Sequence, residues 1–183
     1  MGDAYKAAQM TDRVWWVGAI DWDIRDFHGY MTGRGTTWNA FLILGEEPIL
    51  IDTVKSSARA EMMARIASVI DPTDIRHVVS NHTEMDHSGA LPEVVRLCRP
   101  ETLFASQMGA KGLPAHFDVG MPITAVKDQE TVQLGDTTLT FVETRMVHWP
   151  DSMFTYFAED QVLFTSDGFG MHLASQQRYA DEL

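Results

Sequence analysis

The stretch "SNHTEMDHSG", residues 80–89, places four potential metal ligands within six positions: His82, Glu84, Asp86 and His87. Imidazole and carboxylate groups are the side chains that bind transition metals in proteins. Residues two apart on a helix face different directions, so this spacing suits a helical site poorly. On a loop that leaves a strand, neighbouring side chains can converge on more than one ion. The run therefore predicts a metal site on a loop; the alternative is a hydrophilic turn with its histidines in solvent.

Two further potential ligands follow strand-like runs elsewhere in the chain. His148 ends "TFVETRMVH" and Asp167 ends "QVLFTSD", just as the first motif follows the apolar run "IRHVVS" (75–80). Sites in layered folds collect in loops at the ends of strands. Alone, His148 would be typical of a structural histidine and Asp167 of a turn residue. Their joint placement favours a site at one edge of a sheet.

The rest of the chain alternates strand-like and helical patterns. Residues 13–20, 36–44 and 48–53 indicate an antiparallel meander. The run 56–70 has helical spacing, with serines placed to cap its start and Asp71-Pro72 to end it. Further strands are expected at 75–80, 102–106, 122–126, 130–135, 137–144, 153–160 and 161–167, and further helices at 90–100 and 107–117. This order predicts one layered domain of the α/β or α+β class.

The composition excludes several classes of protein. The 183 residues suffice for one domain with a core, and a net charge of −12 argues against a nucleic-acid partner. Cys98 is the only cysteine, so no intrachain disulfide can form, and a reducing compartment fits. No apolar run is long enough to span a bilayer, and the N-terminus lacks the apolar core of a secretory signal. We therefore expect a cytoplasmic protein that binds no membrane.

The ligand pattern resembles a known superfamily. His82-x-Glu84-x-Asp86-His87, followed by His148 and Asp167, is similar to the metallo-β-lactamase superfamily and, within it, to the flavodiiron proteins (A-type flavoproteins of the rubredoxin:oxygen oxidoreductase type). The segments "DWDIRDFHGY", "GTTWNAFLI", "HWPDSM" and "SDGFGMHLAS" strengthen the resemblance, which runs from about residue 12 to the end. It implies an α+β fold, the αββα sandwich, of which residues 1–183 would form the N-terminal portion.

The same resemblance implies a non-haem diiron centre. His82, Glu84 and His148 would hold one iron, Asp86 and His87 the other, and Asp167 would bridge them. Hydrolases of the superfamily usually carry histidine at the position of Glu84, and a hard anionic ligand there shifts preference from zinc towards iron or manganese. Three carboxylates against two divalent cations leave one net positive charge, which a bridging hydroxide would neutralise.

Two residues outside this ligand set have expected places near it. Asp52 is expected to order loop backbone beside the site rather than to bind metal. His28 is open to two interpretations: a residue close to the metals, as its counterpart in the family can be, or a loop histidine.

The activity implied by the resemblance is reduction of dioxygen to water or of nitric oxide to nitrous oxide. FMN would supply the electrons, a rubredoxin-like carrier would be the donor, and the protein would form a head-to-tail dimer or tetramer. The family pattern requires one more histidine ligand and a flavodoxin-like FMN domain, and neither occurs in residues 1–183. Stable folding is therefore expected to need another copy or a complementary chain. Two alternatives remain: a dizinc hydrolase of the same fold, and a non-catalytic module that only assembles with a partner chain.

Overall fold

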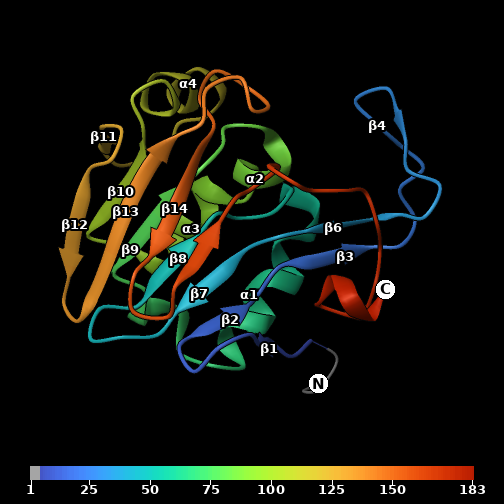
Figure 1. The fold of residues 1–183 in the computed structure, drawn as a ribbon, viewed down its shortest axis with the longest axis horizontal. Coiled ribbons are helices and arrows are strands. Elements are labelled where there is room, and N and C mark those ends of the chain that lie inside the picture. The colour runs from blue at the N-terminus through green and yellow to red at the C-terminus, as the bar shows by residue number, and fades with distance from the viewer. Residues whose placement is uncertain (1–4) are drawn as a thin grey trace.

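The computed structural model describes residues 5–183, in which two β-sheets pack face to face (Figure 1). The larger sheet has seven strands in the order β1-β2-β7-β8-β9-β10-β11. Neighbours from β1 to β8 are antiparallel, and those from β8 to β11 are parallel. Its strands are β1 (Ala8–Gln9), β2 (Val14–Trp16), β7 (Phe41–Ile43), β8 (Ile49–Ile51), β9 (His77–Ser80), β10 (Thr102–Ser106) and β11 (Ile123–Val126).

The second sheet is an antiparallel meander of consecutive strands. It contains β12 (Thr131–Leu134), β13 (Thr137–Glu143), β14 (Met153–Phe157) and β15 (Val162–Phe164). The remaining strands form two antiparallel two-stranded sheets: β3 (Ala19–Asp21) with β6 (Thr36–Trp38), and β4 (Asp26–Phe27) with β5 (Tyr30–Met31). They form a ribbon that extends from the larger sheet and carries β4 near its tip (Figure 1). The predicted strands are confirmed, although β2/β3 and β6/β7 are each interrupted by two residues.

Alternation along the central strands explains why the larger sheet is buried on both faces. On β8, Leu50 belongs to the core on the helical side, whereas Ile49 and Ile51 belong to the core between the sheets. On β9, Val78 and Val79 divide in the same way. Successive side chains of a strand point to opposite faces, so continuous apolar runs are typical of strands with both faces covered.

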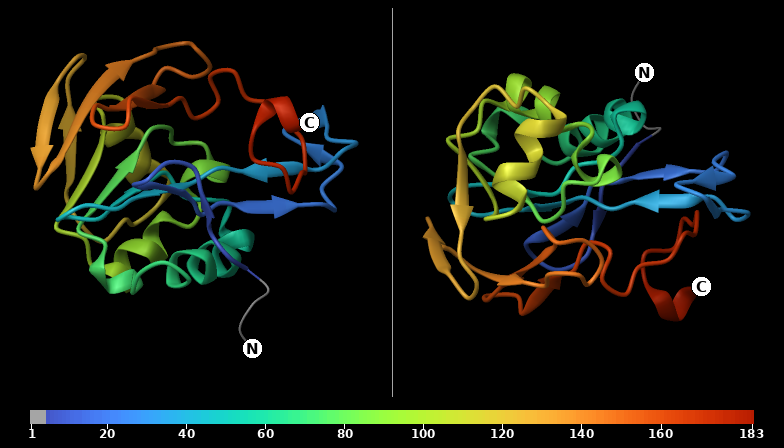
Figure 2. Two further views of the ribbon diagram at one scale, coloured as in Figure 1. Left: turned by 60° about the horizontal axis from the view of Figure 1, so that its bottom comes forward. Right: turned by 90° about the horizontal axis from the view of Figure 1, so that it is seen from above.

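The helices lie on one side of the larger sheet (Figure 2). They are α1 (Arg59–Ala67), α3 (Leu91–Cys98) and α4 (Gly109–His116), with a short α2 (Met85–Ser88). Short 3-10 turns occur at Ser56–Ala58, at Pro72–Asp74 and, on the opposite side of the sheet (Figure 2), at Ala180–Glu182. Met62 and Ile66 of α1 and Val94 of α3 are fully buried against the sheet. Cys98 packs in the same core.

The prediction that serines cap the helix at 56–70 is wrong. Residues 56–58 form a separate 3-10 turn, α1 begins at Arg59, and neither start has a side-chain cap hydrogen bond. The first turn of α1 is instead held by its packing, because Met62 and Ile66 are buried on the sheet.

The layer order is α-β-β, as expected for the N-terminal portion of an αββα sandwich. The inner face of the smaller sheet is apolar and contacts the larger sheet through Leu139, Phe141, Met153 and Phe157. Its outer face carries half-buried Phe154 and Tyr156 and exposed Leu163. Within residues 5–183 no helix covers that outer face (Figure 2). In the same range no helix is long and apolar enough to cross a membrane.

Candidate metal centre

The motif at 80–89 is half loop and half helix. Residues 81–84 leave the end of β9 as a loop, as predicted, but Asp86 and His87 lie on the single turn of α2. The turn is closed by backbone bonds from His87 and Ser88 to the Glu84 carbonyl and by the Ser88 hydroxyl to the same oxygen. Glu84 keeps an extended backbone just before the turn. The loop prediction is therefore wrong for Asp86 and His87.

The loop is anchored from beneath by a buried polar network. Asp52 accepts hydrogen bonds from the Asn81 backbone N–H at 2.7 Å and from the Asn81 side-chain amide at 3.0 Å. The amide oxygen of Asn81 accepts a bond from the Thr155 hydroxyl at 2.6 Å, which joins the loop to the smaller sheet. Asp52 has a φ of 58°, and burial raises its pKa to about 6. The prediction that Asp52 orders the loop backbone is confirmed.

Four predicted ligands form a first group around Glu84. One Glu84 oxygen, Oε2, lies 3.2 Å from His82 Nε2 and 3.0 Å from His148 Nε2. Asp167 Oδ2 lies 3.7 Å from His82 Nε2 and 3.8 Å from His148 Nε2. All four ligand atoms lie within 4.8 Å of one another.

A second group shares Asp167 with the first. Asp167 Oδ1 lies 2.8 Å from His87 Nε2, which is 3.4 Å from Asp86 Oδ2. Asp86, His87 and Asp167 meet the same 4.8 Å limit. Asp167 thus directs one oxygen to each group, which is the arrangement that a bridging carboxylate needs.

The donor atoms are spaced as ligands of a common ion would be. Two N or O donors about 2.1 Å from one ion and at right angles to each other lie about 3 Å apart. The four shortest contacts within the two groups, 2.8 to 3.4 Å, fall in this range. Asp86 Oδ1 is buried without a hydrogen-bond partner in the described part of the chain, and such an acceptor is costly unless a cation satisfies it. The residues therefore fit a pair of metal ions.

In the metal-free protein, protonated histidines compensate the negative charge of the buried carboxylates. Burial lowers the pKa of His82, but hydrogen bonds to Asp151 and Glu84 outweigh it and raise the pKa to about 10. Burial lowers the pKa of His87 as well, but the hydrogen bond to Asp167 outweighs this effect, and the pKa of His87 rises to about 9. Burial works against the charge of Glu84, yet His82 and His148 hold its pKa at about 2. The cluster is thus built to stabilise positive charge at its centre.

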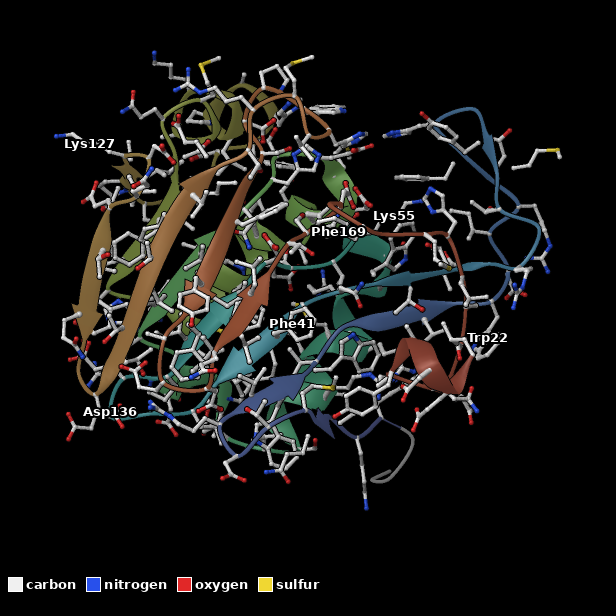
Figure 3. The ribbon with its side chains drawn as sticks, in the orientation of Figure 1. Trp22, Phe41, Lys55, Lys127, Asp136 and Phe169 are labelled. Atoms are coloured by element: carbon white, nitrogen blue, oxygen red, sulfur yellow. The ribbon has the colours of Figure 1, made fainter. Side chains whose placement is uncertain are left out.

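The centre opens into a cavity of about 260 Å³ beneath the β4–β5 hairpin. His28, at a φ of 50° between these strands, lies with Nδ1 2.5 Å from Glu84 Oε1, which settles its position close to the site. Phe27 stacks on the His28 ring at 4.2 Å, and His172 makes an edge contact with Phe27, with ring centroids 5.8 Å apart. Lys55 Nζ lies over the Phe27 ring, 5.6 Å from its centroid, and Figure 3 labels Lys55 together with Phe169, of the segment after Asp167.

The sequence prediction missed two supporting residues and misplaced one ligand. Asp151 contacts His82 Nδ1 at 3.0 Å, and Ser166 contacts His87 Nδ1 at 3.3 Å. A carboxylate and a hydroxyl close to predicted ligands in the chain were the available signals. His148 does not end a strand, because β13 stops at Glu143 and a turn with Met146 at a φ of 65° carries His148 back to the centre.

The fold and the paired carboxylate–histidine groups define a protein of the metallo-β-lactamase-like class. The profile described as "ODP family beta lactamase" matches residues 36–183, and the chain belongs to this family. It is 46% identical over 180 residues to a rubredoxin-oxygen oxidoreductase of Megalodesulfovibrio gigas, covering 97% of this chain and 45% of that protein. It is 42% identical over 177 residues to a nitric oxide reductase of Moorella thermoacetica, and the match covers 95% of this chain and 44% of that protein.

Solved structures agree with these relatives. The rubredoxin oxygen:oxidoreductase from Desulfovibrio gigas superposes with a TM-score of 0.93 over 97% of this chain and 45% of that one, at 46% identity. The flavodiiron protein from Giardia intestinalis also gives 0.93, at 36% identity, over 100% of this chain and 45% of that one. The predicted resemblance to flavodiiron proteins is confirmed. The chain spans less than half the length of these relatives.

Proposed function

We propose that residues 82–167 hold two iron ions. His82, Glu84 and His148 bind the first, Asp86 and His87 bind the second, and Asp167 bridges them. The main observation behind this assignment is that the two oxygens of Asp167 contact different groups of ligands. Oδ1 lies 2.8 Å from His87 Nε2, and Oδ2 faces His82 and His148. Glu84 supports iron rather than zinc, because an anionic oxygen among imidazoles is a hard ligand.

We infer that this chain is part of an oxidoreductase that reduces dioxygen to water or nitric oxide to nitrous oxide. The relatives named as oxygen and nitric oxide reductases support both substrates. When bound, the two iron ions would supply redox chemistry and open positions for a diatomic ligand. FMN, held by a flavodoxin-like part outside residues 1–183, would deliver electrons from a rubredoxin-like donor.

This chain's residues shape the proposed reaction chamber. Glu84 and Asp167 keep anionic oxygens fixed at its floor, and His28 holds the second Glu84 oxygen through Nδ1. The chamber has a volume of about 260 Å³, and Glu84, Asp86, His87, His148 and Asp167 are among the residues that line it.

An apolar rim around the chamber supports assembly with another protein surface. Tyr30 and Met171 line the chamber. Further exposed apolar side chains lie within a few residues of its lining in the sequence: Met31, Met85, Met146, Val147 and Phe169. Exposed apolar clusters of this kind mark interaction sites. We propose that the flavin-bearing part docks here, from a second copy in a head-to-tail oligomer or from a complementary chain.

The activity is tested by comparing two reactions of the full-length protein. Purified without oxygen and loaded with iron, it should consume dioxygen or nitric oxide when reduced rubredoxin is supplied. Loaded with zinc, it should not hydrolyse thioesters, lactams or phosphoesters. Hydrolysis with zinc and no gas consumption with iron would support the hydrolase instead. Neither activity, with metal bound, would indicate a non-catalytic module.

Metal affinity is expected to increase with pH. In the metal-free protein the raised pKa values keep His82 positively charged up to about pH 10 and His87 positively charged up to about pH 9. Only the neutral imidazole binds metal. At pH 7 binding must therefore release roughly two protons, and affinity falls as the pH falls. Calorimetry in buffers of different ionisation enthalpy counts the released protons. The His87→Ala variant should release about one fewer, and a count near zero for the unmodified protein would contradict the prediction.

A further inference from the structure

We infer that Asp151 is a positioning residue that holds the His82 imidazole with Nε2 towards the first metal and thereby sets the affinity of that position. The inference rests on the proposed metal centre. Asp151 is buried, and its Oδ2 accepts hydrogen bonds from His82 Nδ1 at 3.0 Å and from the Thr83 backbone N–H at 2.7 Å. A proton fixed on Nδ1 leaves the lone pair on Nε2, which lies 3.2 Å from Glu84.

The rest of the environment prevents His82 from turning. The Trp149 ring meets the imidazole edge-on, with centroids 5.1 Å apart and planes at 85°. The Asp151 carbonyl accepts a bond from Ser106 Oγ at 2.6 Å, and Ser106 Oγ accepts one from the Gly109 N–H at the start of α4. Asp151 is therefore fixed to the larger sheet and cannot follow a displaced His82.

The two metal positions differ in this support. His87 Nδ1 faces the neutral hydroxyl of Ser166 at 3.3 Å, whereas His82 Nδ1 faces a carboxylate. A carboxylate behind a metal-bound imidazole orients the ring and makes it a stronger donor. The turn 148–152 also carries His148, so one segment delivers a ligand and this support to the same ion. Asp151 should consequently affect the first position and not the second.

The test measures metal affinity one position at a time in the full-length protein. In a His87→Ala background, where the first position remains, Asp151→Asn should weaken Co²⁺ binding about 10-fold and Asp151→Ala about 100-fold. In a His148→Ala background, which retains the second position, neither change should alter affinity. Ser166→Ala is the matched control and should weaken binding only in the His148→Ala background.

A second readout follows the imidazole itself. Nitrogen-15 NMR of the metal-free protein at a pH above 10 should show His82 protonated at Nδ1, and Asp151→Ala should give a mixture of both tautomers. Unchanged tautomer and affinity in the Asp151 variants, with only a lower melting temperature, would overturn the inference and leave the metal centre intact. If Asp151→Ala does not fold, Asp151→Asn decides. Failure of the unmodified protein to bind any divalent ion would overturn both.

Discussion

We expect Asp167→Ala to lower the metal affinity of both positions, by up to about 100-fold at each. The reason is geometric, since Asp167 is the one residue that belongs to both groups of ligands in the described part of the chain. Its Oδ1 lies 2.8 Å from His87 Nε2 and its Oδ2 faces the two histidines of the first group. Loss of the carboxylate would also remove the group proposed to bridge the two ions. Titration with Fe²⁺ in metal-buffered anaerobic solution measures both affinities.

Single-group variants provide the comparison for Asp167→Ala. His148→Ala should weaken the first position alone, because His148 contacts Glu84 and the Oδ2 atom of Asp167, which faces the first group, and belongs only to that group. His87→Ala should weaken the second alone. An Asp167→Ala protein that keeps one ion at the original affinity would show that this carboxylate belongs to one metal and does not bridge.

Phe141→Ala is expected to lower the free energy of unfolding by about 3–5 kcal/mol. Phe141 is 1% exposed, lies between the two sheets and contacts the Phe104 ring, with centroids 5.6 Å apart. The truncation removes a large apolar contact and leaves a cavity that the sheets cannot close without moving. For a chain of this size the melting temperature should fall by roughly 6–20 °C. Thermal unfolding followed by circular dichroism measures the change.

The neighbouring Thr140 is the matched control for Phe141, because it lies on the same strand and points to the outer face. Thr140→Ala should cost less than about 1 kcal/mol. His148 lies in the β13–β14 loop of the smaller sheet, and Asp167 follows its last strand, β15. Phe141→Ala should therefore also weaken metal binding, and Thr140→Ala should not. Equal destabilisation by the two variants would contradict the packing between the sheets.

The sequence predicts the meeting of the ligands because the fold brings strand ends and their loops together. The run before His82 is a buried strand in the structure, and Asp167 follows β15 by three residues, so both lie where sites collect. These predictions depend on local apolar runs, which remain buried in any well-packed arrangement. Metal binding by these residues stays a prediction for the experiments above.

The parts that the sequence does not predict depend on contacts distant along the chain. The single helical turn at Met85–Ser88 is too short to form by itself and is held by the Glu84 carbonyl and by the Thr53–His87 contacts. Asp151 reaches His82 from 69 positions away, which no spacing rule indicates. The serines before α1 match a capping pattern, yet the preceding 3-10 turn places them away from its first N–H groups.

The central claim is a pair of iron ions bridged by Asp167, and metal analysis combined with Mössbauer spectroscopy tests it most directly. The full-length protein should be expressed with iron-57, purified without oxygen and measured before and after oxidation. The account predicts two iron ions per chain whose oxidised form is a magnetically coupled pair. A protein that contains zinc and no iron, or iron without coupling, would contradict it.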